Sequence, residues 1–138
     1  MQRYKGAKLE RTRDLFEQAV ATVPPEFARN LYLLYGQLEE NFGLARHAMN
    51  VYERAAKAVQ DTDMYDMYLV YISRAAQYYG ISKTRDIYER AIQALPSNKN
   101  IRDMCLKYSD LERKLGEIDR ARAIFAYAAK FCDPRVDK

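Results

Sequence analysis

The chain has 138 residues, of which 49% are hydrophobic and 30% charged, a composition typical of one globular domain with a packed core. The formal net charge is +4, and this excess lies in the first 13 residues, where five basic side chains accompany Glu10 alone. The composition therefore does not indicate a nucleic-acid-binding surface spread over the whole molecule. No run of 18 apolar residues is present, and the first residues lack the apolar core of a secretory signal, so we expect an intracellular chain without a membrane span.

Apolar side chains recur at the spacing of one helix face along almost the whole chain. The pattern predicts helices over 5–22, 27–42, 44–60, 64–79, 82–95, 99–115 and 117–132. Gly43, Gly80 and Gly116 follow alternate helices, where a glycine suits the left-handed C-cap position. Ser82 and Asp119 offer capping side chains to the helices that follow Gly80 and Gly116.

Two sequence motifs alternate along the chain at a fixed interval. In the first motif an aromatic residue is followed three positions later by alanine, and its copies are Phe16 and Ala19, Tyr52 and Ala55, Tyr88 and Ala91, and Phe125 and Ala128. In the second motif two aromatic positions precede a glutamate, and its copies are Tyr32, Tyr35 and Glu39, then Tyr68, Tyr71 and Ala75, then Cys105, Tyr108 and Glu112. Corresponding positions are 36 or 37 residues apart, which indicates stacked helical hairpins.

The predicted fold is therefore all-α, a right-handed α-solenoid of antiparallel helix hairpins with about 3.5 repeats. Residues 1–138 form one domain in this interpretation, with an unpaired second helix over 5–22 and repeats over 27–60, 64–95 and 99–132. The repeated alanines let the helix backbones approach closely, and the repeated aromatic side chains fill the space between hairpins.

The second motif resembles the HAT (half-a-TPR) repeat, although the chain has no tryptophan and carries Ala75 where glutamate is expected. Longer segments narrow the resemblance, namely residues 31–40 with 43–49, and residues 115–124 with 132–135. These segments are similar to the Syf-type pre-mRNA splicing factors, known in animals as the XPA-binding protein family, within the crooked-neck-like HAT superfamily.

The resemblance implies a nuclear scaffold of a NineTeen-type spliceosomal complex that binds spliceosomal proteins, including other HAT-repeat proteins. It also implies a link to transcription-coupled DNA repair in animals. Since members of this family are far longer, we expect the chain to be a segment of such a protein or a reduced relative. An excised array exposes apolar end surfaces, so self-association is a further expectation.

No constellation of residues typical of an enzyme, a metal site or a cofactor site is present in the sequence. His47 is the only histidine and is expected on a helix surface, while Cys105 and Cys132 are expected to pack in the interior. Two alternatives to the splicing scaffold remain open. One is an RNA-contacting array that uses the basic residues Arg3, Lys5, Lys8, Arg11 and Arg13, and the other is a TPR-like peptide receptor outside splicing.

Overall fold

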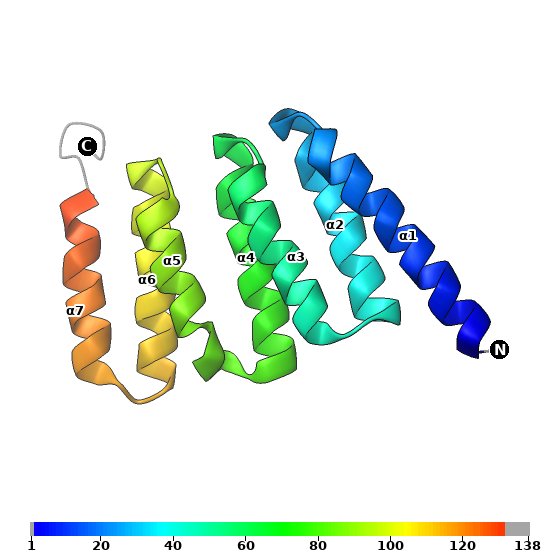
Figure 1. The fold of residues 1–138 in the computed structure, drawn as a ribbon. Coiled ribbons are helices and arrows are strands. Elements are labelled where there is room, and N and C mark those ends of the chain that lie inside the picture. The colour runs from blue at the N-terminus through cyan, green and yellow to red at the C-terminus, as the bar shows by residue number, and fades with distance from the viewer. Residues whose placement is uncertain (1, 132–138) are drawn as a thin grey trace. The chain divides into compact units, whose positions relative to one another are not determined.

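A computed structural model describes the backbone of residues 2–131 and the side chains of residues 8–131 (Figure 1). In chain order the helices are α1 (Gln2–Thr22), α2 (Pro25–Phe42), α3 (Ala45–Ala58), α4 (Asp61–Tyr79), α5 (Arg85–Ala94), α6 (Asn98–Lys114) and α7 (Ile118–Ala128). Two 3-10 helices, η1 (Ile81–Thr84) and η2 (Ala129–Phe131), precede α5 and follow α7. Residues 2–131 contain no strand, and the predicted all-α fold of hairpin repeats is confirmed.

Most helix ends have a local cause. Pro25 occupies the first turn of α2, where its missing N–H costs nothing, and the Ser97 hydroxyl accepts a hydrogen bond from the Asn100 amide at the start of α6. The backbone at Gly80 and Gly116 has φ of +90° and +84°, the left-handed region predicted for these glycines. The predicted caps at Ser82 and Asp119 are wrong, since neither η1, α5 nor α7 has a side-chain cap.

The left-handed prediction for Gly43 is also wrong, because its φ is −112°. The reason for a glycine here is space rather than backbone freedom. A Cβ at this position would overlap the carboxylate of Glu39 and lie 2.9 Å from the Arg13 guanidinium. Gly43 therefore makes room for the ion pair between these two side chains.

The segment that was predicted to begin a helix at residue 82 has a different local structure. Ile81–Thr84 form the 3-10 helix η1, and the α-helix begins only at Arg85. The Thr84 hydroxyl donates a hydrogen bond to the Ile81 carbonyl over 2.6 Å and closes this turn. The corresponding residues after α2 and α6 lie in the regular α-helices α3 and α7.

The described chain separates into two compact units, residues 1–71 and residues 72–138. In the first unit α2 packs against both α1 and α3. In the second unit α6 packs against both α5 and α7. In each unit, a helix that carries the second motif thus lies between two helices that carry the first motif (Figure 1).

The repeated alanines lie in the most tightly packed parts of the chain. Ala55 and Ala91 are 0% exposed, Ala128 is buried, and Ala19 near the end of α1 is half-buried. A larger side chain at a fully buried alanine has no room without displacement of the neighbouring helix.

We expect Ala91→Leu to lower the free energy of unfolding by about 1–3 kcal/mol, because the added methylenes overpack the core around α5. Ala94→Leu is the matched control, since Ala94 lies on the same helix and is exposed. Urea denaturation of both variants measures the difference. An equal effect of the two substitutions would contradict the tight packing at Ala91.

Gly36, in the middle of α2, is the second position where space is limiting. A Cβ at Gly36 would overlap the ring of Tyr52, which is 1% exposed and whose hydroxyl donates a hydrogen bond to Glu40. In an unobstructed helix, Ala is more favourable than Gly by about 1 kcal/mol. We therefore expect Gly36→Ala to destabilise the wild-type chain but to stabilise a Tyr52→Ala variant, and thermal unfolding of the four proteins tests this reversal of sign.

Candidate interaction surfaces and the residues that build them

Two parallel aromatic stacks join helices of adjacent repeats. Phe16 of α1 stacks on Tyr35 of α2 with ring centroids 5.1 Å apart, and Tyr88 of α5 stacks on Tyr108 of α6 at 5.3 Å. The interplanar angles are 3° and 2°. In both units, therefore, the aromatic residue of the first motif stacks on the second aromatic residue of the second motif.

A buried carboxylate lies beside the first stack. Glu39 of α2 has a side chain that is 3% exposed, and Arg13 of α1 binds it through two hydrogen bonds. Arg13 Nε donates to Oε2 over 2.7 Å and Nη2 donates to Oε1 over 2.8 Å. This two-pronged geometry fixes the relative position of α1 and α2 along their axes.

The second unit contains the equivalent carboxylate with one more partner. Glu112 of α6 is 0% exposed, and it accepts hydrogen bonds from Arg85 Nε and Arg120 Nε, each over 2.6 Å. Burial alone would raise the pKa of Glu112, but the two guanidinium groups outweigh it and the pKa is lowered. Glu112 therefore connects α6 to the helices on both of its sides.

The hydroxyl groups of the stacked tyrosines are also bound to charged groups. Tyr35 donates to Glu17 over 2.5 Å, and Arg54 of α3 binds the same carboxylate through two hydrogen bonds of 2.7 and 2.8 Å. Burial, together with the bond to Glu17, raises the pKa of Tyr35 to about 12. The Arg54 guanidinium lowers the pKa of Glu17.

Tyr108 has the corresponding role in the second unit. Its hydroxyl donates to Glu89 over 3.0 Å and accepts from Arg120 Nη2 over 2.7 Å. Burial raises the pKa of Tyr108, and the bond to Glu89 raises it further. Arg120 thus links Tyr108 to Glu112.

At the level of the sequence, the corresponding pair of positions in the first and middle repeats, residues 27–60 and 64–95, carries no charge. The residues at the positions of Arg13 and Arg85, and of Glu39 and Glu112, are Met49 and Ala75. Both side chains are buried. An arginine and a glutamate are therefore replaced together by two apolar residues, which removes both charges rather than leaving one of them unpaired.

The remaining motif residues fall into two groups. Tyr32, Tyr68 and Tyr71 are buried, and Phe16 is half-buried in its stack. Phe125 is 62% exposed, in contrast to the interior position expected for it. No described α-helix follows α7 to cover the ring, so Phe125 does not fill a gap between hairpins within residues 2–131.

The basic residues near the start of the chain do not act as one group. Lys8 and Arg11 are exposed, whereas Arg13 is half-buried and bound to Glu39. Arg3 and Lys5 lie within α1, and their side chains are outside the described part. The role of Arg13 could have been found from the sequence, because arginines at 13 and 85 precede Glu39 and Glu112 by 26 and 27 residues.

The other candidate groups have ordinary environments. His47 is exposed on α3, and Cys105 is buried in α6, where burial raises the pKa of its thiol. The prediction for Cys132 lies outside the described residues. Across the described side chains, no group of three or more His, Cys, Asp or Glu residues is placed to hold a metal ion, and no described helix is long and apolar enough to cross a membrane.

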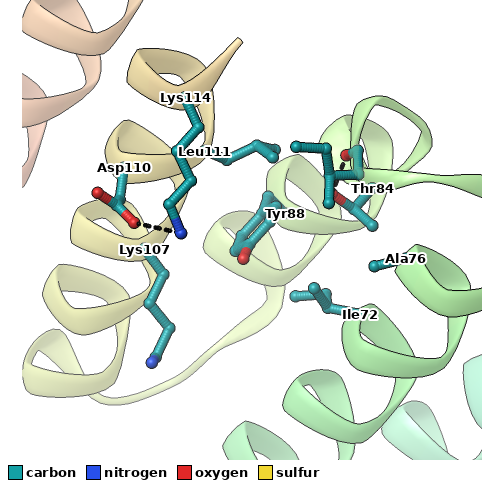
Figure 2. Close-up of a pocket in the computed structure, with 9 residues that line it drawn as sticks. Ile72, Ala76, Thr84, Tyr88, Lys107, Asp110, Leu111 and Lys114 are labelled. Atoms are coloured by element: carbon teal, nitrogen blue, oxygen red, sulfur yellow. Dashed lines mark hydrogen bonds and ion pairs between the residues drawn. The ribbon is translucent and has the colours of Figure 1, made fainter.

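A pocket of about 270 Å³, which the sequence did not predict, opens in the second unit (Figure 2). It is lined by Ile72 and Ala76 of α4, Ile81 and Thr84 of η1, Tyr88 of α5 and four residues on one face of α6. We call it the α4–α6 pocket. Ala76 is the one signal in the sequence, since the corresponding residues are Glu40 and Arg113, both of them large and charged.

Comparison with known proteins identifies the family to which these repeats belong. The family model described as "Pre-mRNA-splicing factor Syf1/CRNKL1 C-terminal HAT repeat" matches residues 1–138. The chain belongs to this family.

Named relatives agree with this result. The chain is 57% identical over 136 residues to the pre-mRNA-splicing factor syf1 homolog of Drosophila melanogaster, a match that covers 99% of this chain and 15% of the relative. It is 59% identical over 133 residues to human pre-mRNA-splicing factor SYF1, a match that covers 96% of this chain and 15% of the human protein. The pre-mRNA-splicing factor SYF1 of Dictyostelium discoideum is 54% identical over 135 residues, which are 98% of this chain and 16% of that protein. The chain thus spans about 15% of the length of these splicing factors.

We expect Arg13→Met to lower the free energy of unfolding by about 3 kcal/mol, because it leaves the buried Glu39 carboxylate without its partner. Glu39→Ala should cost less, since the freed Arg13 can reach water. The double variant copies Met49 and Ala75, the residues at the corresponding positions one period later, and should be more stable than Arg13→Met alone. A double-mutant cycle, measured by urea denaturation, gives the coupling free energy between Arg13 and Glu39. Strictly additive effects of the two substitutions would contradict the buried ion pair.

The Glu112 ion pairs should also make stability depend on pH. Because its pKa is lowered in the folded state, the stabilisation is complete above the pKa of the unfolded chain, about 4.3, and is lost as pH falls through the folded-state pKa. We therefore expect the difference in unfolding free energy between wild type and Glu112→Gln to shrink from pH 6 to pH 3. Glu117→Gln, at an exposed carboxylate, is the control. A difference that does not change with pH would contradict the assignment.

Proposed function

We propose that this chain is a protein-binding module of a nuclear pre-mRNA splicing scaffold, and that it acts within a NineTeen-type spliceosomal complex. The observation that carries the proposal is the match of the whole chain to the Syf1/CRNKL1 HAT-repeat family, together with relatives named as pre-mRNA-splicing factors. The expected partners are spliceosomal proteins, including other HAT-repeat proteins. The unbroken 36- or 37-residue interval across residues 71 and 72 supports the use of residues 1–138 as one module.

The chemistry of the described side chains supports binding rather than catalysis. The buried charged groups are engaged in ion pairs that hold helices together, as Glu39 and Glu112 illustrate. Large apolar side chains remain exposed on the outer faces, among them Phe27, Leu34 and Phe42 of α2. Exposed apolar groups on rigid helices are suited to contacts with a partner protein.

Direct RNA contact is the second candidate, and exposed Lys8 and Arg11 on α1 are the observation in its favour. The structure reduces the available charge, since Arg13 is bound to Glu39. If these residues bind phosphates, the affinity for a single-stranded RNA oligonucleotide should fall steeply as the salt concentration rises. Lys8→Ala and Arg11→Ala should each reduce the slope of log affinity against log salt concentration by about one, as for the loss of one phosphate contact.

Affinity purification of the tagged chain from nuclear extract, with and without RNase, followed by mass spectrometry, tests the proposed function. We expect spliceosomal proteins, other HAT-repeat proteins among them, to remain enriched after RNase treatment. Enrichment only without RNase would favour the RNA-contacting alternative. Absence under both conditions would contradict the proposal for this segment, provided that the full-length relative purifies its partners in parallel.

A further inference from the structure

The α4–α6 pocket has apolar side chains on several of its walls and is too small for a typical cofactor. Ile72, Tyr88 and Leu111 are buried and line it from three different helices. Its volume of about 270 Å³ lies below the range of about 300–1,000 Å³ typical of small-molecule sites. The space therefore suits one or two large side chains of a partner better than a whole ligand.

The pocket exists because the middle repeat departs from its neighbours at two places. Ala76 on α4 replaces the charged side chains found at the equivalent positions, Glu40 and Arg113. The 3-10 helix η1 replaces the first α-helical turn and places Ile81 at the pocket, with 44% of the residue exposed. A small residue on one wall and an exposed apolar residue on another leave room for an apolar group from outside.

The α6 side of the pocket is positively charged. Lys107 and Lys114 are two turns apart on α6, and Asp110 lies between them (Figure 2). Asp110 is already bound by Lys114 over 3.1 Å and by Arg113 over 2.6 Å. Lys107 is exposed and has no acidic partner among the residues that the structure describes. The other carboxylate of this segment, Glu112, is buried and already bound by Arg85 and Arg120, so three cations accompany one accessible carboxylate on this part of α6. Exposed Lys83 of η1 adds another positive charge.

We propose that the α4–α6 pocket binds one large apolar side chain from an acidic segment of a partner protein. The apolar side chain enters between Ile81, Ala76 and Leu111, and aspartate or glutamate residues next to it in the partner contact Lys107 and Lys114. This assignment rests on the proposed role as a protein-binding module and adds the contact face and the chemistry of the partner. Charge complementarity favours an acidic partner, since like charges across a contact are unfavourable.

Selection from a displayed library of short random peptides on the 138-residue chain tests this site. Ala76→Arg is the variant for counter-selection, because it fills the pocket with the residue that the third repeat carries at position 113. Ser73→Arg is its matched control, since it adds the same charge at an exposed position of α4. Unfolding curves of both variants establish that they are folded, and Ala76→Leu fills the pocket without charge if Ala76→Arg does not fold.

We expect the enriched peptides to carry an aromatic or large aliphatic residue flanked by Asp or Glu. Their affinity should fall at least about tenfold on Ala76→Arg, as for removal of an apolar anchor from its pocket, and should be unchanged on Ser73→Arg. Lys107→Glu should weaken binding and reduce its salt dependence, whereas Lys99→Glu, which reverses an exposed charge on the same helix, should not.

Other outcomes would overturn the assignment. No enrichment over the counter-selection, a basic or uncharged consensus, or equal binding to Ala76→Arg and Ser73→Arg would exclude an acidic segment as the occupant. Binding of a single-stranded RNA oligonucleotide that depends on Lys107, without peptide binding, would assign the surface to RNA. Failure of the inference is distinguishable from failure of the proposed function, because Ala76→Arg would then still purify spliceosomal proteins after RNase treatment.

Discussion

Two buried carboxylates set the helix positions in this chain. Glu39 and Glu112 are removed from water, and a carboxylate in that environment is strongly unfavourable unless charged donors surround it. Arg13 provides those donors in the first unit, and Arg85 and Arg120 provide them in the second. A shift of α2 along α1 would separate the two-pronged pair, so the ion pairs select one register among many that would bury similar apolar area. The glycine at position 43 exists to leave space for this contact.

The sequence was sufficient for the elements that depend on periodicity. Helix positions, the 36- or 37-residue interval and the buried alanines all follow from apolar spacing, because helices bury one face whatever their partners are. It was insufficient where a side chain reaches across to another helix. On the sequence alone, Arg13 is grouped with the other basic residues near the start of the chain. The repeated spacing of Arg13 to Glu39 and of Arg85 to Glu112 is a signal for the pair, but a long side chain has many rotamers and the fold is needed to show the contact itself. The sequence likewise predicts Gly43 as a left-handed cap, because the need for space beside the Arg13–Glu39 pair is visible only in the fold.

The repeats differ where function is expected to differ. The two charged junctions resemble each other, since Arg13 with Glu39 corresponds to Arg85 with Glu112, whereas the positions between them in the sequence carry Met49 and Ala75. In the middle repeat, Ala76 also replaces the charged side chains found at the equivalent positions. The η1 turn adds a backbone difference at the same repeat. A common framework therefore holds the helices, and a few departures from it shape the α4–α6 pocket. Periodicity alone cannot predict such a surface, because it arises from exceptions to the period.

The stacked tyrosines have a consequence for spectroscopy. The chain contains 12 tyrosines and no tryptophan, so its near-ultraviolet signals come mainly from phenol rings. Tyr35 and Tyr108 release their protons at higher pH than a free phenol, because each is buried and bound to a carboxylate at a junction between helices. Because the pKa values of Tyr35 and Tyr108 are raised, an alkaline absorbance titration should show a late class that contains these two residues. The late class is an unlabelled optical probe of whether these junctions are intact.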